Sequence, residues 1–181
     1  MSEVGDLDRS GMLPAVSRLP RPRRVALGLC ICERLLPHYQ EFSRREGWGD
    51  YPLLVVALDE LWAYAAGAEA NRPRLRELAA AVEVAIPDPD EFPGASGALD
   101  AGVAVLGALQ CALDGDAAHV VMAAGGAVDT ISQMDGAVGG ESPLVAREIA
   151  AQEHDLALLS TQPDVNLQAL RALYAAQAGP A

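Results

Sequence analysis

The chain contains no lysine, and all 13 of its basic residues are arginine. This absence excludes chemistry that needs a lysine amine, namely a phosphate-binding P-loop lysine, a Schiff base and the covalent anchor of pyridoxal phosphate. Aromatic residues are also scarce, at 4% of the chain. The core must therefore be built mainly from alanine, leucine and valine.

Several short catalytic signatures are missing as well. The sequence has no Cys-x-x-Cys pair, no Gly-x-Ser-x-Gly elbow and no glycine-rich phosphate loop. Its cysteines number only three, and Cys30 and Cys32, two positions apart on an expected helix, cannot readily form a disulfide. The first ten residues lack the apolar stretch of a signal peptide. We therefore expect a reduced, cytoplasmic protein.

Basic residues are few in the second part of the chain. Residues 1–76 contain 11 arginines and 10 acids, a net charge of +1, whereas residues 77–181 contain 2 arginines and 15 acids, a net charge of −13. So acidic a surface repels phosphate backbones and anionic lipids, and we expect no nucleic-acid partner. The longest nearly uncharged apolar run, residues 101–113, is too short to span a bilayer, so no membrane partner is expected. The acidic surface could instead bind an unidentified protein that carries positive charge.

What is present favours helices. The length of 181 residues and the hydrophobic content of 51% suffice for one domain with its own core. Alanine and leucine are strong helix formers, and they predict an all-α, single-domain bundle of about seven helices over residues 23–177. Residues 1–22 are predicted to form a mobile or loosely docked segment, and residues 178–181 a disordered tail. Because small side chains bury limited area, a homodimer is also predicted.

Proline and capping residues predict several helix boundaries. Pro37 is expected either to kink the helix that begins near Arg23 or to start a second helix. Asp50 or Tyr51 is expected to cap the following helix, and Ser96 a long helix further along the chain.

The helix expected after Pro143 has two contrasting sets of side chains. Val145, Ile149 and Leu156 are expected to face inward, because they share one side at helical spacing. The tripeptide at residues 153–155, Glu-His-Asp, is expected to form a solvated face.

Glu33 and Arg34 are the most informative polar residues, an adjacent acid and base within an otherwise apolar helical stretch. Adjacent helical side chains point about 100° apart and cannot simply pair with each other. We expect a buried clamp in which another helix holds Glu33, through an arginine or through N–H groups near Tyr51 or Ala98. A ligand-binding or catalytic role and simple surface exposure are the alternatives.

No metal site or other cofactor is predicted. A calcium-binding EF-hand that began at Asp88 would need glycine and glutamate where the chain has Pro93 and Leu99, so a rigid acidic turn is the preferred interpretation. Asp116 and His119 share one helix face, but the further ligands that a metal centre needs are not repeated elsewhere.

Several of these motifs together resemble one family. They are the run from Cys32 to Tyr39, the Gly-Trp-Gly-Asp of residues 47–50, the Leu-Asp-Glu-Leu-Trp of residues 58–62, and the acidic stretches around residues 88–92 and 99–101. The chain resembles the YjaG-like family of uncharacterised bacterial proteins (domain of unknown function 416). The resemblance implies a compact all-α bundle and assigns no catalytic residues. The predicted motif or clamp residues are Glu33, Arg34, Pro37, Tyr39, Asp50, Trp62, Asp88, Asp90, Phe92 and Asp100.

These observations favour a non-enzymatic binding or interaction protein. The alternative is a small-molecule enzyme that uses a cluster of Glu33, His38, Asp50 and Asp100. The two hypotheses differ in geometry: an enzyme would bring these four side chains together in an open pocket, whereas a scaffold would use them to cap helices or to join them.

Overall fold

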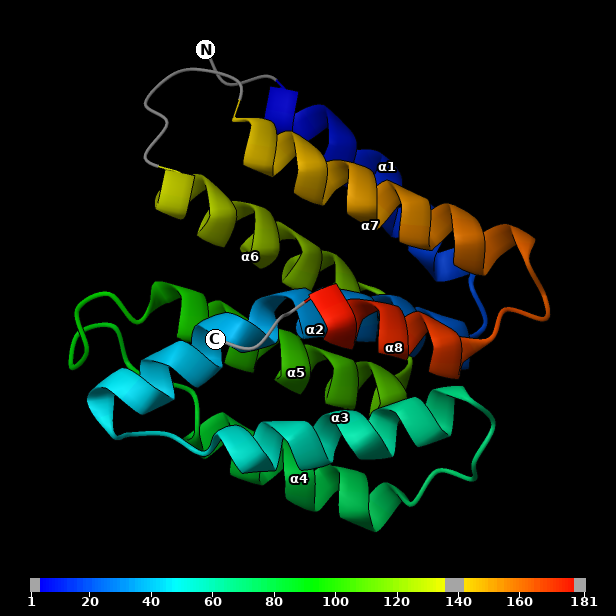
Figure 1. Ribbon diagram of the computed structural model, residues 1–181. Helices are drawn as coiled ribbons and strands as arrows, with labels where there is room; N and C mark the ends of the chain where they lie inside the picture. Colours follow the sequence, from blue (N-terminus) through cyan, green and yellow to red (C-terminus); the bar gives the residue numbers. More distant parts are fainter. Residues whose placement is uncertain (1–3, 136–141, 178–181) are drawn as a thin grey trace.

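The computed structural model describes residues 4–135 and 142–177, and all regular structure in these ranges is helical. The helices stack in three layers, with α1, α6 and α7 on one side, α2, α5 and α8 in the middle, and α3 and α4 on the other side (Figure 1). Their bounds are α1 Val4–Arg18, α2 Arg21–Glu46, α3 Tyr51–Ala65, α4 Arg72–Val84, α5 Ser96–Asp114, α6 Ala118–Asp135, α7 Pro143–Thr161 and α8 Leu167–Gln177. The predicted all-α, single-domain bundle is confirmed, with eight helices in the described ranges.

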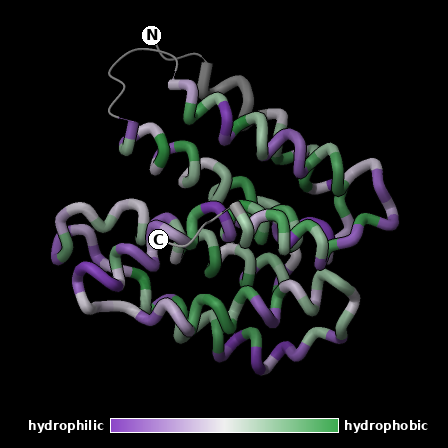
Figure 2. The backbone as a smooth tube through the Cα atoms, viewed as in Figure 1, coloured by the Kyte–Doolittle hydropathy of each residue, from purple (hydrophilic) through white to green (hydrophobic). Residues whose placement is uncertain are grey.

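The hydrophobic residues lie where the layers meet. Polar stretches gather at the end of α2, along α4 and in the connection from α7 to α8 (Figure 2). Among the described helices, α5 alone has the length and composition to cross a membrane, and 56% of its apolar window is buried inside the protein. Core helices of soluble proteins share these properties.

The N-terminal segment differs from the prediction. Residues 1–22 were expected to be mobile or loosely docked, but α1 packs against α6, and Val16 at its end is fully buried, at 0% exposure. The guanidinium of Arg24 donates hydrogen bonds to the carbonyls of Val16, Ser17 and Leu19, so it satisfies the end of this helix. The predicted tail at residues 178–181 lies outside the described residues.

Helix α2 is the centre of the bundle and packs against α3, α5, α6, α7 and α8. Pro37 lies inside this helix, which runs without a break from Arg21 to Glu46. The prediction that Pro37 could start a second helix is therefore wrong. Pro37 cannot donate to the carbonyl four residues earlier, and the turns on either side continue the helix across this missing bond.

Arginines of the first half of the chain donate hydrogen bonds to backbone carbonyls at the ends of helices in the second half. Arg21 donates to the carbonyl of Asp114 at 3.2 Å, and Arg72 donates to that of Leu113 at 2.8 Å. Arg23 donates to the carbonyl of Leu159 at 2.6 Å, near the end of α7. The last carbonyls of a helix lack intrahelical donors and carry partial negative charge. The arginines that are concentrated in the first part of the chain thus stabilise the helix ends of its acidic second part.

The cap predictions succeed in part. The carboxylate of Asp50 accepts a hydrogen bond from the backbone N–H of Leu53 at 2.9 Å, which makes Asp50 the N-cap of α3. Ser96 does not cap α5, because the helix begins at Ser96 itself and Ala95 takes the N-cap position without a side-chain bond.

Four aromatic rings fix the end of α2 against the loop before α5. Phe42 makes edge contacts with Tyr39, Trp48 and Phe92, with centroids 6.3, 6.0 and 5.5 Å away. The Tyr39 hydroxyl donates to the carbonyl of Ala85 at 2.6 Å and accepts from the N–H of Asp50 at 3.1 Å. One tyrosine therefore joins α2 to the start of α3 and to the end of α4.

Gly49 is tied to this tyrosine, and its replacement is our first prediction. Gly49 has φ of +90°, and a Cβ built there would lie 2.6 Å from the hydroxyl oxygen of Tyr39. Gly67, with φ of +107°, has nothing within 4 Å of such a Cβ. Gly49→Ala should lower the free energy of unfolding by more than Gly67→Ala, whose cost of about 1–3 kcal/mol reflects backbone strain alone. Urea unfolding of the two variants measures the difference, and equal losses would show that the contact with Tyr39 relaxes freely.

Candidate functional site

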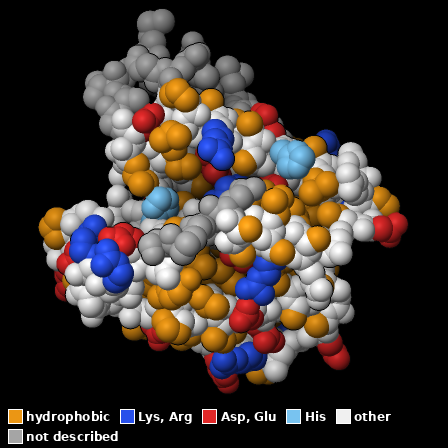
Figure 3. Space-filling view, in the orientation of Figure 1, with side chains coloured by type: hydrophobic (Ala, Val, Ile, Leu, Met, Phe, Trp, Pro, Cys, Tyr) orange, Lys and Arg blue, Asp and Glu red, His pale blue; other side chains and the backbone are white. Residues whose placement is uncertain are grey.

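An open cleft lies between the layer of α6 and α7 and the helices α2 and α8. Its volume is about 390 Å³, which is within the range of small-molecule sites. Apolar side chains gather over α6 and α7 on the face that carries the cleft (Figure 3). The lining residues are Glu33, Arg34, Pro37, His38, Ile131, Met134, Leu144, Arg147, Glu148, Ala151 and Tyr174.

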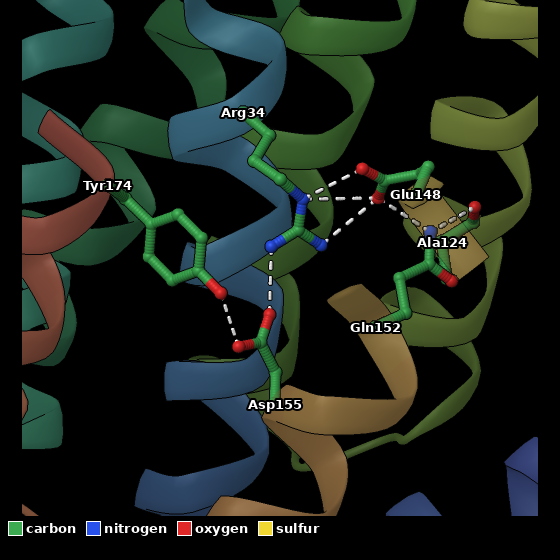
Figure 4. A network of polar contacts seen from close by, with 6 residues as sticks. All are labelled: Arg34, Ala124, Glu148, Gln152, Asp155 and Tyr174. Carbon is green, nitrogen blue, oxygen red and sulfur yellow. Dashed lines mark hydrogen bonds and ion pairs between the residues drawn. The ribbon is translucent and has the colours of Figure 1, made fainter. Parts of the chain in front are cut away.

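Arg34 forms the charged floor of this cleft. Its side chain is 15% exposed, and its Nε lies 2.9 Å from Oε2 of Glu148 while its Nη2 lies 3.0 Å from Oε1 (Figure 4). Its Nη1 donates to Oδ2 of Asp155 at 2.8 Å. One arginine of α2 therefore binds two carboxylates of α7, and the paired bonds to Glu148 are the geometry that arginine favours.

The start of α7 aims these carboxylates at α2. The Ser142 hydroxyl accepts a hydrogen bond from the N–H of Val145 at 3.1 Å and caps the helix, and Pro143 occupies the first turn. From this start, Glu148, Gln152 and Asp155 follow at spacings of four and three residues, so they share one face of the helix. That face is turned inward, and all three residues are buried.

Two further side chains complete the network in Figure 4. The Gln152 amide donates to Oε1 of Glu148 at 2.9 Å and to the carbonyl of Ala124 on α6 at 3.1 Å. The Tyr174 hydroxyl of α8 donates to Oδ1 of Asp155, and the Arg34 guanidinium lies 5.2 Å from the centre of the Tyr174 ring. The network therefore connects α2, α6, α7 and α8.

The charge states follow from burial and pairing. Burial alone would lower the pKa of Arg34, but the Glu148 and Asp155 carboxylates more than offset this effect and raise the pKa above its ordinary value. Burial, together with the hydrogen bond to Asp155, also raises the pKa of Tyr174 well above its ordinary value. The hydroxyl therefore stays a donor, and the guanidinium stays charged.

Glu33 is held by a second set of contacts. It is 7% exposed, and its Oε1 accepts hydrogen bonds from Nε1 of Trp62 at 2.9 Å and from Nε of Arg171 at 3.3 Å. Arg171 also contacts Asp59, with Nη2 2.5 Å from Oδ1. These contacts join α2 to α3 and α8. The partners of Glu33 are thus an arginine and an indole, rather than the N–H groups at the start of another helix.

The other residues that the sequence singled out lie apart from these two networks. Asp100 of α5 accepts a hydrogen bond from the Thr130 hydroxyl of α6, and burial raises its pKa. The Asp88 carboxylate accepts from the N–H of Asp90 at 2.9 Å in an exposed turn, and Phe92 packs against Trp48 with ring centres 5.0 Å apart. The roles of the predicted clamp residues stay a prediction, which the variants in the Discussion test.

The four residues of the enzyme hypothesis are not brought together. Glu33 and His38 line the cleft, whereas Asp50 caps α3 and Asp100 bonds to Thr130. The three cysteines are buried and form no disulfide. Burial raises the pKa of Cys111 to about 11, and it raises those of Cys30 and Cys32 as well. Protonated, buried thiols are poor nucleophiles. Within residues 4–135 and 142–177, no three histidine, cysteine or carboxylate side chains converge as a metal site would require.

His38 provides a prediction on pH. Burial lowers its pKa below the ordinary value of 6.5, because the half-buried ring is harder to charge than it is in the unfolded chain. The unfolded chain then binds more protons, so wild-type stability should fall as the pH drops from 6.5 through the lowered pKa. His38→Gln should lack this part of the pH dependence. Melting temperatures of both proteins between pH 4.5 and 8 give the comparison, and a difference that is constant with pH would contradict the prediction.

Sequence reasoning missed most of the α7 and α8 side of the site. Residues 153–155 were expected on a solvated face, but Asp155 is 0% exposed, and only Glu153 and His154 face outward. Val145, Ile149 and Leu156, expected to face inward, are half-buried, since polar residues take the inner face. The sequence feature that could have revealed this side of the site is the helical spacing of Glu148, Gln152 and Asp155. An inward polar stripe of this kind would have indicated a buried partner for Arg34.

The fold and the site define a class of protein: a single-domain helical bundle whose interior charges tie helices together beside an open cleft. The chain belongs to the family described as "Protein of unknown function (DUF416)", whose model matches residues 11–178. The resemblance found in the motifs is therefore confirmed.

Two proteins of known sequence or structure are similar to the chain. It is 26% identical over 172 residues to "Uncharacterized protein YjaG" of Escherichia coli (strain K12), a match that covers 88% of this chain and 87% of that protein. Its fold is similar to that of a DUF416 family protein from Shewanella baltica OS155, solved by crystallography at 1.91 Å resolution. The TM-score is 0.76 at 20% identity, and the match covers 91% of this chain and 93% of the other.

Proposed function

We propose that this protein is a non-enzymatic binding protein whose ligand enters the cleft between α2, α6, α7 and α8. One observation carries the proposal: the cleft opens to solvent, but its two carboxylates already bind arginines. Glu148 is held by Arg34, and Glu33 is held by Arg171 and Trp62. A carboxylate engaged in this way is a poor general base, because taking up a proton would break its ion pair. The cleft is better suited to holding a ligand than to reacting with it.

An unbiased fragment screen by two-dimensional NMR tests this proposal. We expect amide shifts to cluster at cleft residues such as Ile131, Met134 and Ala151, and the fragments should be recovered unchanged. Met134→Asp, a substitution at a side chain that is 64% exposed, should weaken binding without loss of fold. Chemical conversion of a bound fragment would instead favour a small-molecule enzyme that uses the two residues of the alternative hypothesis at the cleft, Glu33 and His38. Shifts confined to other surfaces would contradict the proposal.

We also propose that the protein is a cytoplasmic homodimer. Buried, reduced cysteines fit the cytoplasm, where disulfides are rare. Two large hydrophobic side chains on opposite outer layers, Val84 of α4 and Met122 of α6, are mostly exposed, and a second copy of the chain could cover the surface around one of them. Sedimentation equilibrium over a hundredfold range of concentration should give the mass of a dimer. A monomer at every concentration would leave an unidentified protein as the proposed partner of this surface.

A further inference from the structure

The acidic part of the chain has only two arginines, and one of them lies at the cleft. Residues 77–181 contain 15 acids and only two basic residues, Arg147 and Arg171. Arg171 is committed to Glu33 and Asp59. Arg147 lines the wall of the cleft on α7, and no ion pair with another residue of the described ranges holds it there.

Arg147 is available to a ligand. Its side chain is exposed, and it forms no ion pair with any residue in the described ranges. The neighbouring Glu148 turns its two oxygens to Arg34, so it does not neutralise Arg147. Within the described residues, one positive charge therefore stands without an ion-pair partner on the cleft wall of a protein whose net charge is −12.

His38 contributes a polar group from the α2 side of the cleft. The ring lines the cleft and makes no hydrogen bond within the described part of the chain. Burial lowers its pKa, so the imidazole is neutral at pH 7 and can donate one N–H. The remaining walls are apolar, and they include Pro37, Ile131, Met134 and Leu144.

We propose that the cleft binds a small amphipathic carboxylate, with its carboxylate on Arg147 and its apolar body against Ile131, Met134 and Leu144. A cationic ligand is disfavoured for two reasons. Arg147 would repel it, and the cleft carboxylates Glu33 and Glu148 that could bind it are already paired with arginines. A polyphosphate would need several cations, whereas Arg147 is the one cleft arginine without an ion pair in the described part of the chain. A volume of about 390 Å³ accommodates a molecule of modest size. This inference rests on the proposed function and specifies its ligand.

Three probes with the same eight-carbon chain test the inference: octanoate, 1-octanol and octylammonium. Titration of the isotope-labelled full chain should show octanoate shifting cleft amides at concentrations at least about tenfold below those that the other two require, because a charge-assisted bond contributes that much or more. Arg147→Gln should remove this preference and leave the binding of 1-octanol unchanged. Arg76→Gln, which removes the same charge from an exposed position on α4, is the matched control and should bind octanoate as the wild type does.

The possible outcomes separate the inference from the function on which it rests. Equal binding of the three probes in the cleft, or undiminished octanoate binding by Arg147→Gln, would overturn the carboxylate assignment and leave a cleft-binding protein. Shifts scattered over the exposed hydrophobic residues of other helices would also overturn it, because they indicate adsorption. No cleft shifts with these probes or in the fragment screen would overturn both proposals. Melting temperatures of the variants confirm that each one is folded.

Discussion

Arg34→Ala should lower the free energy of unfolding by about 3–5 kcal/mol, the cost of removing one partner of a buried ion pair. The variant leaves Glu148 and Asp155 buried without their cation, and these residues are 4% and 0% exposed. Arg34→Lys should lose an intermediate amount, because an ammonium cannot make the paired bonds to Glu148 and also reach Asp155. Urea unfolding followed by circular dichroism measures both effects.

Arg44→Ala is the matched control for this experiment. Arg44 also pairs with a glutamate, Glu41, with Nη2 2.8 Å from Oε1, but both side chains are exposed. Its removal should leave the unfolding midpoint unchanged within error. If Arg34→Ala behaved like Arg44→Ala, the network in Figure 4 would contribute nothing to stability, and the architectural role of Arg34 would be wrong.

Glu33→Ala should lower the free energy of unfolding by about 3 kcal/mol, since it leaves a buried indole N–H without an acceptor and removes one carboxylate from Arg171. Glu33→Gln keeps an oxygen for Nε1 of Trp62 and should lose less. Asp59→Ala removes only the exposed partner of Arg171 and should have a small effect.

A double-mutant cycle isolates the contact between Glu33 and Trp62. Trp62→Phe removes the N–H donor, so the cost of Glu33→Ala should be smaller in that background than in the wild type. Additive losses would show that the indole bond does not contribute. A melting curve unchanged by Glu33→Ala would end the clamp hypothesis for this residue.

The sequence predicted the fold class, and it singled out Glu33 and Arg34 without identifying the residues that bind them. Glu33 could be recognised as a residue that needs an outside partner, because its neighbour Arg34 points elsewhere on the helix. The partners themselves could not be found, since Glu148, Asp155 and Arg171 lie 114, 121 and 138 residues away from the residues they bind. Local patterns carry no information on which helices become neighbours across such separations.

Local sequence signals predicted the structure correctly where tertiary contacts agreed with them, and failed where tertiary contacts outweighed them. Asp50 was recognised as a cap because an aspartate before a proline-containing first turn is a local signal. Pro37 and the segment of residues 1–22 were misjudged for a common reason. A proline stays inside α2, and α1 stays docked, because contacts with the rest of the bundle outweigh the local preference.

The long sequence separation between α2 and the residues that bind its charges has a consequence for biosynthesis. Helix α2 is made early on the ribosome, yet the carboxylates that neutralise Arg34 belong to α7, and the arginine that holds Glu33 belongs to α8. A nascent chain that ends before Pro143 has a central helix whose Arg34 and Glu33 lack the ion-pair partners that α7 and α8 supply. Its final burial must wait until α7 and α8 have been synthesised, so the centre of the bundle closes late in the folding of this protein.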